Sequence, residues 1–326
     1  MLRLGYDIGG MSVRACLLDD QSMRVAAHTS RPFPLGKDAQ ALTELMAQMA
    51  REVLLPNGLD AWTVESVGVG IPGTVRRDMG VLVSACNLNL RNAPVAELLR
   101  RHFPHADIGI ANDADAAALA EARVGALRGY DCAMLITIGT GIGGGLIMDN
   151  RIFQGGRKIG CELGHITIQQ GGPMCTCGNR GCAEALCSAT WLEREGRHCV
   201  LDHPTSRIAV LAGGEVHNVT ARDVIAAARE GDGIAAQIFD AYVDNLASLV
   251  STCCYLLGTP VVGIGGGVSN AGEFLIRPLE EQVKRRARAY APDRIVTAAL
   301  GGDAGMIGAA MLPAAQGIRS TKGMHV

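Results

Sequence analysis

Runs of apolar residues near the start of the chain predict three short strands joined by tight turns. The runs cover residues 2–6, 13–18 and 23–29, and turns rich in glycine, aspartate and serine separate them. Short apolar runs bounded by such residues are typical of neighbouring strands in a sheet. The simplest arrangement is a β-meander, in which each strand pairs with the next.

Helical and strand patterns alternate through the rest of the chain. Within residues 38–55, apolar side chains at Leu42, Leu45, Met46 and Met49 repeat with a helical period. Further helices are predicted at 95–103, 116–122, 220–229, 234–257, 273–290 and 304–312, and further strands at 67–71, 107–111, 132–138, 146–148, 261–264 and 294–297. Residues 194–215 show no clear period, and 316–326 are expected to form a loose tail. The alternation is typical of an α/β fold.

One pattern occurs twice, namely strand, glycine hairpin, strand and acidic turn. The first copy covers residues 6–19 and the second covers 137–149. A spacing of roughly 130 residues is far beyond the period of stacked repeats and indicates two related lobes. We therefore predict an α/β protein with two lobes and a ligand cleft between them.

Composition narrows the class of protein. The chain has 326 residues, and 30 lysines and arginines against 32 aspartates and glutamates give a net charge of −2, which disfavours a nucleic-acid binder. A hydrophobic fraction of 48% with 19% charged residues argues against disorder. No apolar run approaches the roughly 20 residues that span a bilayer, and we expect no signal peptide. The 11 cysteines, an odd number, favour reduced thiols or a metal site in the cytoplasm.

The two glycine hairpins are candidate phosphate-binding loops. Glycines let phosphate oxygens approach backbone N–H groups, and a nearby hydroxyl can add a donor. The candidates are Asp7, Gly9, Gly10 and Ser12 in the first hairpin, and Gly139, Thr140, Gly141 and Gly143 in the second. A dinucleotide-binding fingerprint is rejected for the second hairpin because a strand follows where the fingerprint requires a helix. The alternative is that both are tight hairpins without a ligand.

A polar cluster directly follows the predicted strand 107–111. It contains Asn112, Asp113 and Asp115. Ligands in open α/β sheets bind at the carboxyl ends of the strands, so Asp113 is a candidate general base toward a substrate hydroxyl, positioned by Asn112. The alternative is a helix N-cap, for which Asn and Asp are preferred residues.

One histidine and three cysteines lie within 18 residues: His165, Cys175, Cys177 and Cys182. An imidazole and three thiolates suit a closed tetrahedral zinc site. We therefore predict a structural Zn²⁺ site, with scattered free cysteines as the alternative. No such spacing surrounds four other cysteines, which we expect in the core: Cys16, Cys187, Cys253 and Cys254.

Two glutamates, Glu162 and Glu184, flank the histidine and cysteine cluster. A loop fixed by a metal would hold their carboxylates rigidly, as recognition of paired sugar hydroxyls requires. Each could equally be an ordinary surface residue. Weaker candidates, for an adenosine pocket, are two glycine-rich stretches: Gly265, Gly266 and Gly267, and residues 301–305.

Taken in order, these motifs resemble the ROK family of sugar kinases and repressors, within the actin-like ATPase superfamily. The resemblance covers nearly the whole chain. Its motifs are Asp7-Ile8-Gly9-Gly10, Asn112-Asp113, the second hairpin at 135–145, Glu162-Leu163-Gly164-His165, and Cys175-x-Cys177-Gly178-Asn179-x-Gly181-Cys182-x-Glu184. The cysteine motif is highly specific. The resemblance implies a two-lobed actin-like ATPase (ribonuclease H-like) fold, with a small lobe of 1–113 plus 303–326 and a large lobe of 114–302.

The resemblance also implies a function, an ATP-dependent hexose 6-kinase with glucose as the default substrate. Asp113 would deprotonate the sugar 6-hydroxyl for in-line attack on the γ-phosphorus of ATP, and Asp7 would help seat Mg²⁺. His165 would give one ring nitrogen to zinc and the other to the sugar. The residues implied to hold the sugar are Gly73, Asn87, Asn112, Asp113, Glu162, His165 and Glu184. The expected partners are the sugar, ATP and a second copy of the chain, with neither nucleic acid nor membrane.

Three departures from the family pattern leave the substrate open. Met11-Ser12 stands in place of Thr-Lys, Pro72-Gly73-Thr74 in place of Pro-Gly-Pro, and Cys86-Asn87-Leu88-Asn89-Leu90 in place of Pro-Asn-Leu-Gly-Trp. The alternatives are a kinase for N-acetylmannosamine, N-acetylglucosamine, allose or fructose, and a catalytically inactive sugar-binding protein. A sugar-responsive repressor is disfavoured because it would need a helix-turn-helix ahead of Asp7.

Overall fold

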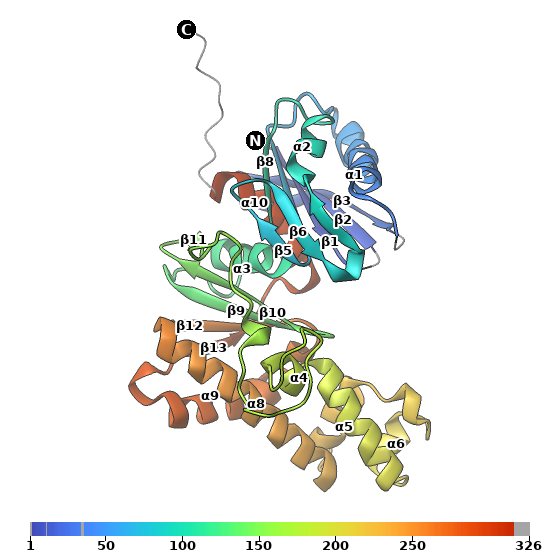
Figure 1. Ribbon diagram of the computed structural model, residues 1–326, viewed down its shortest axis with the longest axis vertical. Coiled ribbons are helices and arrows are strands. Elements are labelled where there is room, and N and C mark those ends of the chain that lie inside the picture. Colours follow the sequence, from blue (N-terminus) through green and yellow to red (C-terminus); the bar gives the residue numbers. More distant parts are fainter. Residues whose placement is uncertain (1, 11, 34–35, 316–326) are drawn as a thin grey trace. The chain divides into compact units, whose positions relative to one another are not determined.

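The computed structural model describes residues 2–10, 12–33 and 36–315 (Figure 1). Contacts between residues divide the chain into two compact units. Unit 1 comprises Met1–Asp131, Gly145–Cys161 and Leu300–Val326, and unit 2 comprises Cys132–Gly144 and Glu162–Ala299. Compared with the lobes expected from the sequence, unit 1 gains three segments: 114–131, 145–161 and 300–302.

The first sheet contains the predicted meander. Its strands are β1 (Leu2–Ile8), β2 (Ser12–Asp19), β3 (Arg24–Pro32), β4 (Ser66–Ile71) and β8 (Asp107–Asn112), in the order β3-β2-β1-β4-β8. The first three strands pair antiparallel in sequence order, as predicted. β1, β4 and β8 run parallel, so their carboxyl ends lie at the same edge of the sheet.

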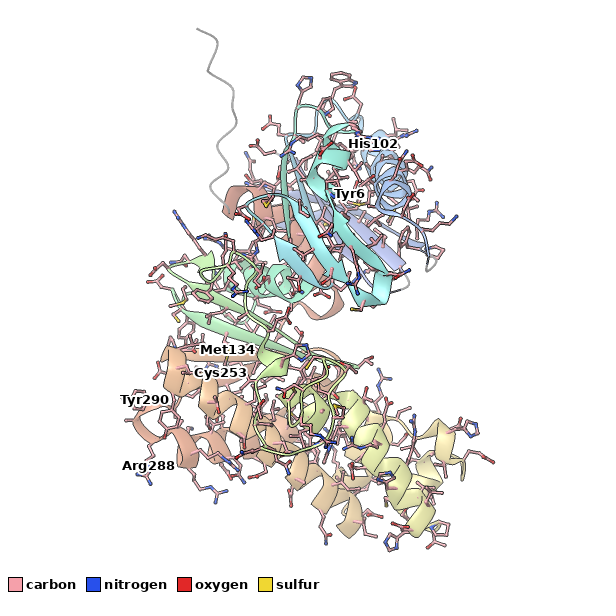
Figure 2. The ribbon with its side chains drawn as sticks, viewed as in Figure 1. Tyr6, His102, Met134, Cys253, Arg288 and Tyr290 are labelled. Carbon is pink, nitrogen blue, oxygen red and sulfur yellow. The ribbon has the colours of Figure 1, made fainter. Side chains whose placement is uncertain are left out.

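The described residues of unit 1 also contain four α-helices and a small sheet. The helices are α1 (Ala39–Leu54), α2 (Val95–Arg100), α3 (Asp113–Val124) and α10 (Ala304–Ala315), and the small sheet holds β5 (Thr74–Arg76), β6 (Val81–Ala85) and β7 (Leu90–Ala93). Asp38 caps α1, and the buried hydroxyl of Tyr6 in β1 donates to the carbonyl of Met46 in α1 at 2.8 Å (Figure 2). The small sheet was not predicted, because its strands are too short to show a period.

The second sheet repeats the strand order of the first. Its strands are β9 (Ala133–Ile138), β10 (Ile142–Met148), β11 (Arg151–Ile152), β12 (Val261–Gly265) and β13 (Arg294–Thr297), in the order β11-β10-β9-β12-β13. As in the first sheet, the central strand pairs with a neighbour in parallel, β9 with β12, and β12 continues in parallel to β13. The predicted duplication is confirmed by this match in strand order.

Unit 2 carries six α-helices in its described residues, α4 (Ala183–Cys187), α5 (Ala189–Asp202), α6 (Arg207–Leu211), α7 (Ala221–Arg229), α8 (Gly233–Leu257) and α9 (Glu273–Ala287). Helices α5 and α6 cover most of the stretch where the sequence showed no period. Gly196 lies at the contact of α5 with Val224 in α7, where a larger apolar residue would not fit, so the apolar period is interrupted. The predicted helix 273–290 ends earlier, because Arg288 adopts φ 50°; Figure 2 shows Arg288 and Tyr290 beyond α9.

Glycines let α10 lie directly against the first sheet and α3. A Cβ atom on Gly5 in β1 or on Gly68 in β4 would collide with backbone carbonyls of α10. Gly308 in α10 likewise makes room for the backbone carbonyl of Ala116 in α3. The helix therefore packs against β1, β4 and α3 more closely than side chains would permit (Figure 1). Within the described residues, no helix combines the length and apolar character needed to cross a bilayer.

We expect Gly68→Ala to lower the free energy of unfolding by about 1–3 kcal/mol, since the new methyl group would push α10 away from β4. Gly233→Ala is the matched control. It lies at the first position of α8 with nothing near its Cβ position, so it should be neutral or slightly stabilising. Chemical denaturation of the three proteins measures both effects. Equal stability of Gly68→Ala and the parent chain would contradict the packing described for α10.

Candidate functional site

Two candidate carboxylates lie at the carboxyl edge of the first sheet. Asp7, near the end of β1, is in register with Gly70 of β4, and Gly70 is in register with Ala111 of β8. Asp113 follows β8 directly, at the first position of α3. The parallel strands thus bring together Asp7 and Asp113, which lie far apart in sequence, at the edge where α/β sheets bind ligands.

Both carboxylates are largely buried, and burial changes their protonation. Burial, together with the negative charge of Asp113, raises the pKa of Asp7 from 3.8 to about 6, while Arg14 opposes this rise. Burial also raises the pKa of Asp113, and its own backbone hydrogen bonds limit that rise. The pKa of Asp7 therefore lies closer to neutral pH than that of an ordinary aspartate, and the pKa of Asp113 is shifted in the same direction.

Three further residues surround Asp7. Residues 301–305 were predicted only as part of an adenosine pocket, and Arg14 was not predicted. Arg14 Nη1 lies 4.0 Å from Asp7 Oδ2, and the same guanidinium forms an ion pair with Asp303. Gly305 has no Cβ, and one built there would lie 2.7 Å from the carboxyl carbon of Asp7. Arg14 lies two residues after Ser12 on β2, hence on the same face of the strand, which is the signal that could have identified it.

The sequence left open whether the Asn112 region is a cap or a site, and the structure shows a cap at Asn112. Asn112 Oδ1 accepts from the N–H of Ala114 at 2.8 Å, and its Nδ2 donates to the carbonyl of Gly73 at 3.1 Å. Asp113 Oδ1 accepts from the same N–H of Ala114 at 2.9 Å. Asp115 instead forms a buried ion pair with Arg77. Asn112 therefore holds both α3 and the β4–β5 turn in place beside Asp113.

Other candidates in unit 1 lie on turns. Gly9 donates its N–H to the carbonyl of Ser12 at 2.8 Å, and Gly10 has open space at its Cβ position, while Met11 lies outside the described residues. Gly73 has φ 104° and packs directly on the end of β6. Asn87 follows that strand and is exposed.

The second glycine hairpin and the Gly265–Gly267 stretch lie together in unit 2. Gly139 donates to the carbonyl of Gly141 at 3.0 Å, and the Thr190 hydroxyl donates to the carbonyl of Thr140 at 2.7 Å. Gly143 lies on β10. Gly265 is in register with Thr137, and Gly266, at φ 82°, packs on the backbone of Ile138. The other adenosine candidate, 301–305, is part of unit 1 and lies beside Asp7.

His165, Cys175, Cys177 and Cys182 form one cluster, with potential ligand atoms that all lie within 4.8 Å of one another. Cys175 Sγ lies 3.7 Å from His165 Nδ1, and Cys177 Sγ lies 3.7 Å from Cys182 Sγ. A tetrahedral zinc ion with bonds of about 2.0–2.3 Å places its ligand atoms roughly 3.5–3.8 Å apart. The donor set and these two distances are compatible with a tetrahedral metal ion.

The loop between the cysteines is folded by its own backbone. Cys175 donates its N–H to the carbonyl of Asn179 at 2.8 Å, and Gly178 donates to the carbonyl of Cys175 at 3.0 Å. Gly178 and Gly181 have φ of 89° and 75°, which glycine adopts without strain. The cysteines expected in the core are buried, as predicted: Cys16, Cys187, Cys253 and Cys254.

The flanking glutamates have different environments. Glu184 lies in the first turn of α4, where Oε2 accepts from the N–H of Ile142 at 3.1 Å and Oε1 accepts from the Thr176 hydroxyl at 3.1 Å. It thereby ties the second glycine hairpin to the cysteine loop. Glu162 is exposed, and its carbonyl accepts from the N–H of His165 at 3.1 Å.

Comparison with known proteins decides the family. The model of the ROK family matches residues 3–316. The chain belongs to the ROK family. A glucokinase of Thermotoga maritima is 33% identical over 312 residues, covering 95% of this chain and 96% of that protein.

Solved structures of ROK proteins share the fold. A ROK family glucokinase from Streptomyces griseus, solved with glucose and AMPPNP, has a TM-score of 0.80 and 29% identity, covering 96% of this chain and 99% of its own. A ROK hexokinase from Thermus thermophilus has a TM-score of 0.80 and 30% identity, covering 96% of this chain and 97% of its own. The predicted actin-like ATPase fold class is confirmed by these similarities.

We expect Asp7→Asn to stabilise this ROK protein above pH 6. Because the folded-state pKa of Asp7 is raised to about 6, the unfolded chain loses this proton first, and stability falls as pH rises from about 4 to 6. Asparagine carries no charge to desolvate. The free energy of unfolding of the variant should therefore exceed that of the parent by on the order of 1–3 kcal/mol at pH 8 and should equal it at pH 4.

Thermal melting at both pH values measures this effect. Asp19→Asn is the control with the opposite sign. Hydrogen bonds from Gln21 and Ser22 lower the pKa of Asp19, so its charged form is the stabilising one and the variant should melt lower at pH 8. A lower melting temperature of Asp7→Asn at pH 8 would show that its carboxylate is stabilised, against the environment described above.

Proposed function

We propose that this ROK protein is an ATP-dependent kinase that phosphorylates the 6-hydroxyl of a hexose, with glucose as its preferred substrate. The observation that carries the proposal is the placement of Asp113, a largely buried carboxylate with a raised pKa, at the end of β8 and beside Asp7. Its whole-length similarity to glucokinases supports the choice of glucose.

Asp113 acts as the general base. A carboxylate with a pKa raised toward neutrality is a better base for a sugar hydroxyl than one with an ordinary pKa. Asp113 accepts the proton of the 6-hydroxyl while the hydroxyl oxygen attacks the γ-phosphorus of ATP. Asn112 fixes the position of this carboxylate by capping α3. Positioning and charge neutralisation carry most of the catalysis in such transfers.

Asp7 serves the nucleotide side of the reaction. Magnesium supplied with ATP neutralises the phosphate charge when bound. Asp7 is the carboxylate that would hold it, with Arg14 keeping part of Asp7 in its charged form. The turns at Gly9, Gly10 and Ser12 and at Gly139, Thr140, Gly141 and Gly143 would hold phosphates through backbone N–H groups. Gly265, Gly266 and Gly267 would hold the adenosine.

The sugar is held by residues of the turns and of the metal loop, which we propose to be Gly73, Asn87, Asn112, Glu162, His165 and Glu184. His165 Nδ1 faces the cysteines, which leaves Nε2 for a sugar hydroxyl. Zinc supplies a rigid tetrahedral crosslink of the loop when bound. Glu184 already spans from Ile142 to Thr176, so its carboxylate is oriented before a sugar arrives.

The setting of the reaction is also part of the proposal. We place the protein in the reducing cytoplasm, where cysteines stay unoxidised, and among the described residues no two cysteines form a disulfide. We further propose a homodimer, on the strength of the family resemblance.

The proposal is tested by sugar-dependent ADP formation with Mg²⁺ and ATP. Glucose, mannose, fructose, allose, N-acetylglucosamine and N-acetylmannosamine are compared at equal concentrations. Glucose is expected to give the highest kcat/KM. A different preferred sugar would change the assigned substrate but would leave the assignment as a kinase unchanged. No turnover with any sugar, from metal-loaded protein, would instead support the binding-only alternative.

We expect Asp113→Asn to lower kcat about 100- to 10,000-fold, because the amide cannot accept the hydroxyl proton. Glucose affinity, measured by calorimetry without ATP, should change little. Asp107→Asn is the control, since Asp107 lies at the opposite end of the same strand. Normal turnover by Asp113→Asn would remove Asp113 from the role of base.

Purified protein should contain about one zinc ion per chain, and Cys177→Ala should lose it together with most of its glucose affinity. Cys86→Ala is the control, because Cys86 is also exposed but lies outside the cluster. Elemental analysis and calorimetry measure the two effects. Full zinc content in Cys177→Ala would exclude this residue as a ligand.

A further inference from the structure

Unit 1 contains a cavity that none of the proposed sugar or nucleotide residues line. Its volume is about 480 Å³, within the range of small-molecule sites. The walls come from Arg77, from the end of β10 and β11, and from the turn that follows β11. β11 lies beside α3, the helix that carries Asp115 (Figure 1).

The cavity is lined by three cationic side chains, Arg77, Arg151 and Lys158. Asp149 is the one acidic residue among its described lining residues. Arg77 is buried and shares its charge with Asp115 through an ion pair. Counting Asp115 as well, three positive and two negative charges leave a net charge of +1. The cavity therefore favours an anion.

Hydrogen bonds of its side chain and of its backbone fix the position of Arg77. Its Nη2 donates to Asp115, and its backbone N–H donates to the carbonyl of Lys158 at 3.5 Å. Among the described residues, no group accepts a hydrogen bond from its buried Nη1. A buried guanidinium nitrogen without an acceptor is unusual in a folded protein. Because Arg77 lines the cavity, its positive charge favours an anion bound there.

The two exposed cations are presented by defined turns. Asp149 and Asn150 have φ of 51° and 60° and form the two-residue connection between β10 and β11, as in a type I′ hairpin, which places Arg151 at the start of β11. Lys158 also has a left-handed backbone, with φ 60°. Such a conformation is uncommon for a residue other than glycine.

We propose that this cavity binds a phosphate group, carried either by inorganic phosphate or by a phosphorylated sugar. A phosphate offers several oxygens to the forked donors of Arg151 and to the ammonium of Lys158, while Arg77 adds its charge to the wall. The volume exceeds that needed by the free ion, so a sugar phosphate should bind more tightly than inorganic phosphate. This claim stands apart from the proposed kinase activity, because it concerns binding alone.

Isothermal titration calorimetry on the full chain tests the proposal, with inorganic phosphate and glucose 6-phosphate as probes at constant ionic strength. The double variant Arg151→Gln, Lys158→Gln should lose about tenfold or more in affinity, since two charge-assisted contacts are removed. Arg157→Gln is the matched control. Arg157 is an exposed cation next to Lys158 that does not line the cavity, so its loss should leave affinity unchanged.

Two further variants keep the test decisive. Asp149→Asn removes the acidic lining residue and should tighten binding several-fold, which a damaged fold would not do. Gly156→Asp adds a negative charge at a lining position whose Cβ has open space, and should abolish binding without altering the circular dichroism spectrum. The two probes distinguish the two possible ligands. Equal affinity for inorganic phosphate and glucose 6-phosphate would assign the site to the free ion.

Equal affinity of the parent chain, the double variant and Gly156→Asp for glucose 6-phosphate would overturn the proposal, because the ligand would then bind elsewhere. Absence of binding by either probe would overturn it as well. Neither result affects the kinase proposal, which depends on sugar-dependent ADP formation. Conversely, if the parent chain has no kinase activity, it can still bind phosphate, and the variants can still lose that binding.

Discussion

The burial of two carboxylates, Asp7 and Asp113, at the carboxyl edge of one parallel sheet is the constraint on which the site depends. Their charges repel and are poorly solvated, so the pKa of Asp7 rises to about 6. Arg14 compensates part of this repulsion from the neighbouring strand. Gly305 leaves space for the Asp7 carboxyl group at the start of α10. The raised pKa shows that the charged form of Asp7 is destabilised in the fold, and perturbed pKa values of this kind are common at functional sites.

The repeated strand order gives the two sheets different chemistry at equivalent positions. The first sheet ends β1 and β8 with Asp7 and Asp113, which suit proton transfer and a cation. In unit 2, Gly139 follows β9 and Gly265 ends β12, and glycines let phosphate oxygens approach the backbone. Glu184 connects the loop that carries the histidine and cysteine cluster to the second hairpin. One duplicated framework thus carries different residues on its turns, and the proposed base, phosphate and sugar roles rest on these differences.

Local sequence patterns predicted much of the fold and of the candidate site. The features that they missed depend on contacts between residues far apart in the sequence. Short stretches of sequence predicted the β-meander, the alternation of helices and strands, and the cysteine motif. The structure confirms the meander and the alternation, and it brings the residues of the cysteine motif into one cluster. The Arg14–Asp303 ion pair joins residues 289 positions apart, and the buried Arg77–Asp115 pair has no local signature. The strands β5, β6 and β7 are stabilised by pairing with one another, because each is too short to be recognised alone.

The pH dependence of kcat/KM for glucose phosphorylation tests the carboxylate pair most directly. The account predicts that kcat/KM falls on acidification with an apparent pKa near 6, because Asp7, whose pKa burial raises to about 6, acts in its charged form. The raised pKa of Asp113 adds to this loss at low pH. Since Arg14 lowers the pKa of Asp7, Arg14→Gln should move this acidic limb to higher pH. A profile that stays flat from pH 5 to 8, or a limb that Arg14→Gln leaves unmoved, would contradict the account.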